Sequence, residues 1–149
     1  SPILKNFVQS VTVDNSVLAA HFKAMLMTTI QVAIGGAIGA VLRFLVGVGL
    51  LRLYSPGFPI SVLIVNVIGS FLMGFFVVAS IQRGGEMLNP FFVTGLLGGF
   101  TTFSAFSLEA VNLFEQGAVS QSIAYIVMSV VFSIIGLIFG SMLARVIWL

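Results

Sequence analysis

Long apolar stretches alternate with short polar ones along most of this chain. Four stretches, at residues 26–51, 60–82, 91–115 and 121–147, are each about as long as a bilayer is thick. A transmembrane helix needs roughly 20 consecutive apolar residues. Residues 54–59, with two prolines and a glycine, and residues 82–90 carry the signals of turns. The pattern therefore predicts an all-α membrane protein with four transmembrane helices.

The composition agrees with this class and excludes several kinds of chemistry. The chain is 59% hydrophobic and 7% charged, far below the roughly 25% charge of an average soluble domain. It has no cysteine and one histidine, which excludes disulfides and thiolate metal sites. No span holds in its interior the pair of acids, or the acid and histidine, of a proton relay, and the sequence shows no Ser-His-Asp set and no phosphate-binding loop. The sequence therefore predicts that the protein is not an enzyme.

Residues 1–24 differ from the rest, because they mix polar and apolar residues and do not span. We interpret them as an amino-terminal extension before a channel domain at residues 25–149. Their apolar residues recur near helical spacing, which is compatible with a helix lying in the membrane interface. Met25 or Met27 would make a natural start, so the extension is alternatively an appended segment.

The third span contains residues that a lipid-facing helix avoids. Gly95, Gly98 and Gly99 weaken a helix, and the hydroxyls of Thr101 and Thr102 can compete for backbone partners. Carbonyls freed at membrane depth cannot face hydrocarbon, so they must meet protein, water or an ion. We therefore predict a helix break near residues 98–102, and we expect the break to be a site.

Aromatic and polar residues follow this break at once. Phe103 and Phe106 are three apart and share a helical face, while Ser104 and Glu109 supply polar groups over the same two turns. Packing in a core is one interpretation of the rings. The other is that their positive edges hold a small anion without a full opposite charge.

The first two spans each contain one strongly polar residue in their interior. Arg43 costs on the order of 3 kcal/mol inside a span unless it is paired or wet, so it either extends to the nearer surface or attracts anions to a vestibule. The Asn66 amide either joins two helices by hydrogen bonds or offers donors to an anion. The residues alone leave both choices open.

In the fourth span, Tyr125, Ser129 and Ser133 fall at i, i+4 and i+8 and form one polar stripe. Serines in membrane helices often bond their own i−4 carbonyl, so the stripe is either locally satisfied or lines a polar path. Glycines on other faces, Gly36 and Gly140 among them, predict close helix contacts. Hydroxyls, an amide, ring edges and one arginine together offer positive potential to an anion, and weak binding suits conduction.

The charges flanking the spans predict only a weak orientation. With a cytoplasmic amino terminus, one side holds Lys5, Lys23, Arg83 and Arg145, and the other holds Arg52. Without the extension the bias is two against one. A core with so little bias could insert both ways, which would permit an antiparallel homodimer.

Three motifs resemble those of the Fluc (CrcB) fluoride ion channel family. They are Gly-Gly-x-Thr-Thr-Phe-Ser-x-Phe at residues 98–106, Gly-Gly-x-x-Gly-x-x-x-Arg at 35–43 and Asn-x-x-Gly at 66–69. The resemblance runs from about Met27 to the end. It implies an antiparallel, dual-topology homodimer with two fluoride pores. It also implies a structural sodium ion at the dimer interface, held by backbone carbonyls of Gly98 and Thr101.

The resemblance also implies roles for the other singled-out residues. Arg43 matches the arginine near the vestibule, and the expected fluoride pore residues are Phe103, Phe106, Asn66, Ser104, Glu109, Tyr125, Ser129 and Ser133. Two features depart from the family: the 24-residue extension, and Leu137 at the next step of the polar stripe, where another hydroxyl is expected.

The function expected from the resemblance is passive, selective export of cytoplasmic fluoride through the cell inner membrane, which reduces fluoride toxicity. The expected partners are fluoride, the lipid bilayer and a second copy of the chain, with no nucleic acid. A dual-topology small multidrug or cation exporter is an alternative, but such exporters need a carboxylate in the first span, which holds Arg43 instead. The other alternative is a non-transporting membrane assembly subunit.

Overall fold

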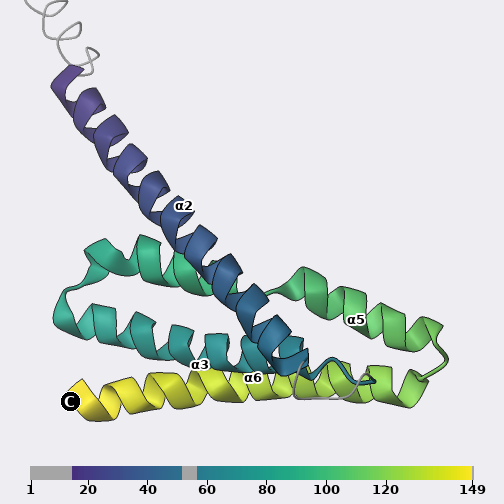
Figure 1. Ribbon diagram of the computed structural model, residues 1–149. Helices are drawn as coiled ribbons and strands as arrows, with labels where there is room; N and C mark the ends of the chain where they lie inside the picture. Colours follow the sequence, from purple (N-terminus) through teal and green to yellow (C-terminus); the bar gives the residue numbers. More distant parts are fainter. Residues whose placement is uncertain (1–14, 52–56, 149) are drawn as a thin grey trace, which may run out of the picture.

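The computed structural model describes residues 15–51 and 57–148 (Figure 1). Lys5, Arg52 and the first 14 residues of the predicted extension lie outside the described residues. Throughout the described part the regular structure is helical. The elements are α2 (Asn15–Leu51), α3 (Ile60–Arg83), η1 (Glu86–Leu88), η2 (Pro90–Leu97), α4 (Gly98–Phe100), α5 (Phe103–Glu115) and α6 (Val119–Trp148).

Four segments of the described chain are long and apolar enough to cross a membrane, as the sequence pattern predicted. They run over Asn15–Leu50, Ile60–Arg83, Pro90–Glu115 and Val119–Trp148. The later three agree with the predicted ranges within two residues. The third of these segments is assembled from η2, α4 and α5, and η2 is a π-helix that the sequence pattern did not indicate.

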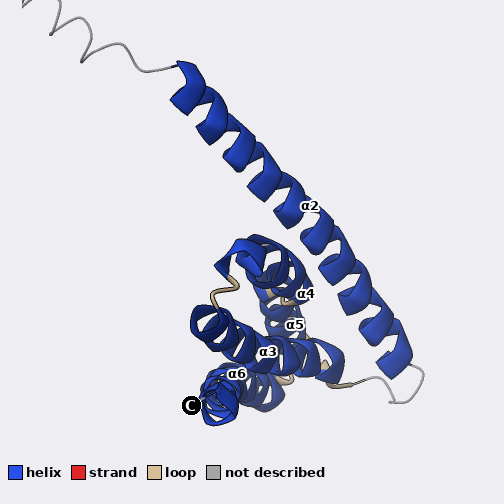
Figure 2. Cartoon of the chain, turned by 90° about the vertical axis from the view of Figure 1, so that its left-hand side faces the viewer, coloured by secondary structure: helices blue, strands red, loops and turns tan. Residues whose placement is uncertain are grey.

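The first long helix starts earlier than the hydropathy pattern suggested. Helix α2 is continuous over 37 residues from Asn15, and it includes residues 15–24 of the predicted extension. Adding turns to an existing helix requires no new nucleus, so residues such as Ala19 and Ala20 readily continue it. Figures 1 and 2 show its amino-terminal end projecting beyond the other helices, and residues 15–30 are all exposed.

Helices α3 and α6 lie side by side and run in the same direction (Figure 1). Their contact depends on glycine, because an added Cβ on Gly74 would collide with the Leu137 carbonyl. An added Cβ on Gly140 would collide with the Phe71 carbonyl in the same way. The two backbones therefore touch, as small residues allow in membrane helices.

A second glycine contact joins α2 to the third segment. An added Cβ on Gly35 would collide with the Phe91 carbonyl, and one on Gly39 with the Leu96 carbonyl. From the third segment, an added Cβ on Gly99 would likewise lie 2.6 Å from the Gly36 carbonyl of α2. This contact fixes the position of η2 and α4 along α2. It thereby also fixes where the helix of the third segment is interrupted.

The buried core of the single chain is small. Phe106, Ala110, Leu113 and Tyr125 form one buried cluster between α5 and α6. Many other large apolar side chains are exposed, including Phe44, Phe103 and Phe139. Exposed apolar surface on this scale suits contact with lipid or another protein, and does not suit contact with water.

Replacing Gly39 with Ala tests the contact between α2 and the third segment. The new methyl group would meet the Leu96 carbonyl and, at 2.8 Å, the Phe100 nitrogen. We expect a stability loss of about 1–3 kcal/mol, because the backbones must separate. Thermal unfolding in detergent measures it. Gly49→Ala is the matched control, because nothing lies within 4 Å of its added Cβ; equal unfolding temperatures for both variants would refute the contact.

Candidate functional site

Regular helix stops at Phe100 and resumes at Phe103. Thr101 (φ −74°, ψ 157°) and Thr102 (φ −151°, ψ 118°) are both extended between α4 and α5. Thr102 caps α5, because its Oγ1 accepts a hydrogen bond from the Ala105 N–H at 3.2 Å. The two threonines that the sequence singled out therefore form the interruption itself.

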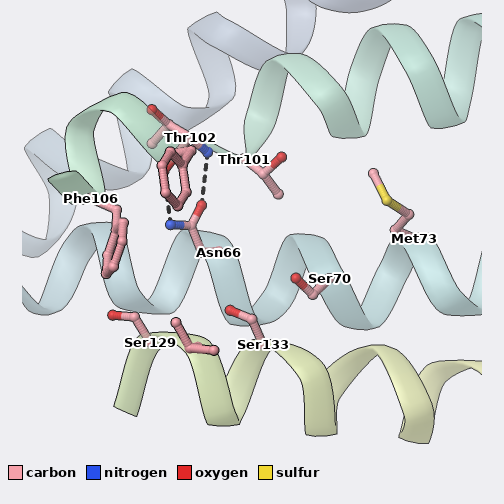
Figure 3. A pocket seen from close by; sticks show the side chains of 10 residues that line it. Asn66, Ser70, Met73, Thr101, Thr102, Phe106, Ser129 and Ser133 are labelled. Carbon is pink, nitrogen blue, oxygen red and sulfur yellow. Dashed lines mark hydrogen bonds between the residues drawn. The ribbon is translucent and has the colours of Figure 1, made fainter. Parts of the chain in front are cut away.

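The Asn66 side chain completes the hydrogen bonding of this interruption. Its Nδ2 donates to the Thr102 carbonyl at 3.0 Å, and its Oδ1 accepts from the Thr102 N–H at 2.8 Å (Figure 3). One amide thus satisfies both main-chain groups of one extended residue. Of the two roles that the sequence left open for Asn66, joining two segments is observed, and the second hydrogen of Nδ2 remains for another acceptor.

These bonds divert two donors from their helical acceptors. In an uninterrupted α-helix the Thr102 N–H would bond the Gly98 carbonyl, and the Ala105 N–H would bond the Thr101 carbonyl. Here the first donates to Asn66 and the second to the Thr102 hydroxyl. The carbonyls of Gly98 and Thr101 consequently lose their helical donors. Thr101 itself still donates in helical register to the Leu97 carbonyl, from its N–H at 3.0 Å and its hydroxyl at 2.9 Å.

A groove of about 250 Å³ is enclosed by the interruption and by the neighbouring parts of α3 and α6 (Figure 3). The side chains that line it come from three of the four long segments and mix hydroxyls, an amide and aromatic rings. They are Asn66, Ser70, Met73, Thr101, Thr102, Phe103, Phe106, Ser129, Val130 and Ser133. The sequence analysis did not place Ser70 and Met73 here, although they follow Asn66 by four and seven residues and so share its helical face.

Three aromatic rings meet at one end of the groove. The Phe106 ring lies 5.3 Å from that of Phe103 and 5.5 Å from that of Tyr125, between centroids. Phe106 is buried, whereas Phe103 is 78% exposed in the single chain. Phe103 therefore forms an edge of the site that the described part of the chain leaves uncovered.

The polar stripe of α6 faces the same region. Ser129 and Ser133 line the groove, and Tyr125 lies behind Phe106 with no exposed surface. Among the described residues, the hydroxyls of Tyr125 and Ser129 are buried and meet no partner with hydrogen-bond geometry. Ser129 therefore does not bond its own i−4 carbonyl, which was one of the two interpretations of this stripe. A buried hydroxyl without a partner costs about 1–3 kcal/mol, so both groups are suited to a ligand or water.

Arg43 lies in a second cavity of about 280 Å³, and Thr102 lines both that cavity and the groove. The walls around Arg43 are mainly apolar, and it forms no ion pair within the described part of the chain. An unpaired guanidinium in such a cavity creates a positive potential beside the interruption.

Besides Tyr125 and Arg43, three more of the predicted site residues lie outside the lining of the groove. Ser104 is exposed, and its hydroxyl oxygen is 3.3 Å from that of Thr102. Glu109 is half-buried on α5 and pairs with no cation among the described residues. Gly98 is exposed on α4 and lies outside the groove. The geometry thus separates an inner groove from an outer face of the interruption.

Comparison with known proteins connects this geometry to a family. The family described as "CrcB-like protein, Camphor Resistance (CrcB)" matches residues 30–141, a range that contains every predicted site residue. A protein of Ruegeria sp. (strain TM1040), named "Fluoride-specific ion channel FluC", is 58% identical over 122 residues, which cover 81% of this chain and 97% of the relative.

More distant relatives carry the same name. That of Roseobacter denitrificans is 53% identical over 80% of this chain and 97% of its own length. That of Ruminiclostridium cellulolyticum is 42% identical over 82% of this chain and 95% of its own length. The match therefore extends over nearly the whole length of proteins from different genera, and the chain belongs to the CrcB-like protein family.

Proposed function

We propose that this protein is a fluoride-selective channel that lets cytoplasmic fluoride leave the cell passively. The observation that carries the proposal is the groove: it combines an amide, hydroxyls and two phenylalanine rings in a chain whose relatives are named fluoride-specific ion channels. Fluoride enters cells as neutral HF from acid surroundings and is trapped by dissociation. A pathway for the anion alone would therefore lower its toxicity.

In the proposed pathway, ring edges and hydroxyls replace the water that fluoride loses. The Phe103 and Phe106 rings carry partial positive charge at their edges, and the free hydrogen on Asn66 Nδ2 is a stronger donor. The unpartnered hydroxyls of Tyr125 and Ser129 would gain an acceptor when the anion passes. None of these groups carries a full charge, so the anion is held weakly enough to leave.

The remaining predicted residues extend this pathway at its ends. Ser133 continues the hydroxyls along the groove, and Ser104 and Glu109 would contribute where α5 leaves it. Arg43 would act at a vestibule, because its unpaired charge attracts anions toward the cavity that Thr102 shares with the groove. Its role is to raise the local anion concentration, not to bind the ion in the narrow part.

We also propose that the interruption makes the third span a broken transmembrane helix with a sodium site. The carbonyls of Gly98 and Thr101 have lost their helical donors, and carbonyl oxygen is a ligand for hard cations. No group of three His, Cys, Asp or Glu side chains in the described residues could hold a metal ion, so carbonyls are the fitting ligands. Bound sodium would supply fixed positive charge and tie two subunits together.

An antiparallel homodimer is the assembly that we propose. Phe103 and Gly98 are exposed on the single chain, although one would line the pore and the other would bind sodium. A second copy would cover both. The weak bias of Lys and Arg between the two sides is compatible with insertion in both directions. We place the dimer in the cell inner membrane, where it would separate cytoplasm from exterior.

The alternatives fit the described residues less well. A cation exporter needs a carboxylate in its first span, and α2 contains neither Asp nor Glu over its 37 residues. A non-transporting assembly subunit gives no reason for two buried hydroxyls without partners beside a groove. The names of the relatives also describe a channel.

The direct test is a flux assay with purified protein in liposomes. We expect fluoride to leave loaded liposomes on dilution, while chloride stays inside. Ion-selective electrodes measure both anions, and liposomes without protein are the control. Absent fluoride flux, or chloride flux of equal size, would contradict the proposed function.

Phe106→Ile tests the aromatic part of the pathway. The isoleucine side chain keeps apolar bulk but removes the ring edge and the contacts of Phe106 with Phe103 and Tyr125. Aromatic pairs of this kind are worth about 0.5–1.5 kcal/mol. We expect fluoride flux to fall by roughly tenfold while gel filtration shows the same particle size. Phe114→Ile on the same helix is the control, because Phe114 is 60% exposed and lies outside the groove. Unchanged flux in the Phe106 variant would assign that ring to packing alone.

Removing sodium tests the proposed cation site. Sodium at a hundred times its Kd would stabilise the folded dimer by about 2.7 kcal/mol. We therefore expect the purified protein to unfold at a lower temperature when sodium is replaced by N-methylglucamine, and to recover when sodium returns. Thermal unfolding and dimer content by gel filtration are the measurements. Identical stability with and without sodium would count against the site.

A further inference from the structure

We propose that Asn66 is the positioning residue of the interruption, holding Thr102 in the extended conformation from which the groove is built. This inference deepens the proposed function and rests on it for its consequence, fluoride passage. The observation itself is structural: one side-chain amide bonds both main-chain groups of Thr102, 36 residues further along the chain.

A carboxamide can make both hydrogen bonds of the pairing at once, because it carries an acceptor and a donor side by side. The acceptor Oδ1 must face the Thr102 N–H while the donor Nδ2 faces the Thr102 carbonyl, at 2.8 and 3.0 Å. A carboxylate supplies the acceptor without the second donor, and an apolar side chain supplies neither. The pairing also fixes which way the amide points, because a flipped amide would place oxygen against carbonyl and nitrogen against N–H.

A fixed amide has two consequences for the site. First, the Thr102 N–H is kept from the Gly98 carbonyl, so the helix cannot continue through the interruption. Second, the remaining hydrogen on Nδ2 cannot rotate away from the groove that Asn66 lines. In the view of Figure 3 the amide nitrogen lies on the side of Phe106. Asn66 therefore keeps the backbone extended at Thr102, and it presents a hydrogen-bond donor to an ion in the groove.

The surroundings of the Asn66–Thr102 pairing explain why losing it would change the backbone at Thr102. Thr102 is buried, and its neighbour Thr101 packs against Gly69 on α3, where an added Cβ would collide with the threonine methyl group. If the two main-chain groups lost Asn66, they would need other partners, and the Gly98 carbonyl is the nearest in helical register.

Backbone NMR of the full chain in detergent micelles tests the pairing without any ion. The sequence contains six threonines but only two Thr-Thr pairs, 28–29 and 101–102. Labelling threonine with ¹³C and ¹⁵N therefore isolates the Thr29 and Thr102 amides, and Thr28→Ser assigns them. Threonine ¹³C shifts distinguish extended from helical backbone, and exchange with deuterated water reports the Thr102 N–H bond.

We expect Asn66→Leu to remove the extended ¹³C shifts of Thr102 or to speed its amide exchange about tenfold, as loss of one hydrogen bond would. Asn66→Asp should keep both signals, because the Oδ1 acceptor remains. Asn112→Leu is the control: this amide lies on α5 outside the groove, so neither signal should change. Unchanged shifts and exchange in Asn66→Leu, or loss of both in Asn66→Asp, would overturn the pairing.

Fluoride flux of the same variants tests the consequence. We expect Asn66→Leu and Asn66→Asp to conduct roughly ten- to a hundredfold less, because neither leaves a spare donor for the anion, and Asn112→Leu to conduct normally. Normal flux in Asn66→Leu despite an altered Thr102 would overturn the positioning role. If the unmodified protein carries no fluoride, the proposed function fails while the NMR result still decides the pairing.

Discussion

Main-chain hydrogen bonding in an apolar medium is the constraint from which the rest of this structure follows. Each unsatisfied N–H or carbonyl facing hydrocarbon costs several kcal/mol, so a spanning segment normally stays helical throughout. Here Thr101 and Thr102 are extended within an apolar segment. The structure tolerates this because the Asn66 amide and the Thr102 hydroxyl bond the main chain in place of the helix. The carbonyls of Gly98 and Thr101 are left without their helical donors.

Glycine determines where that interruption sits. The contacts of Gly35 and Gly39 with the third segment leave no space for a Cβ, so α2 and the third segment meet backbone to backbone. Gly74 and Gly140 do the same between α3 and α6. Side chains would keep these helices further apart. The contact of Gly69 on α3 with the Thr101 methyl group brings Asn66 within hydrogen-bonding distance of Thr102. The contact between α3 and α6 brings Ser129 beside the same groove.

The polar groups and rings at the interruption can all present positive potential to an ion. Amide hydrogen, hydroxyl hydrogens and ring edges all present positive potential without a full charge, and Arg43 adds a full charge at a distance, in a separate cavity. Such a site favours an anion and releases it again. We propose that the buried hydroxyls of Tyr125 and Ser129 serve the same path, because an anion would supply the acceptor that they lack among the described residues.

The sequence by itself determined the four apolar segments, the weakened helix around residues 98–102 and the family, because hydropathy, glycine content and motif spacing are local properties that need no partner. Only the tertiary structure decided that Asn66 pairs with Thr102, that Pro90–Leu97 forms a π-helix and that α2 begins at Asn15. A pattern shows that a buried amide needs partners, but residues 36 apart meet only where glycine contacts bring their segments together.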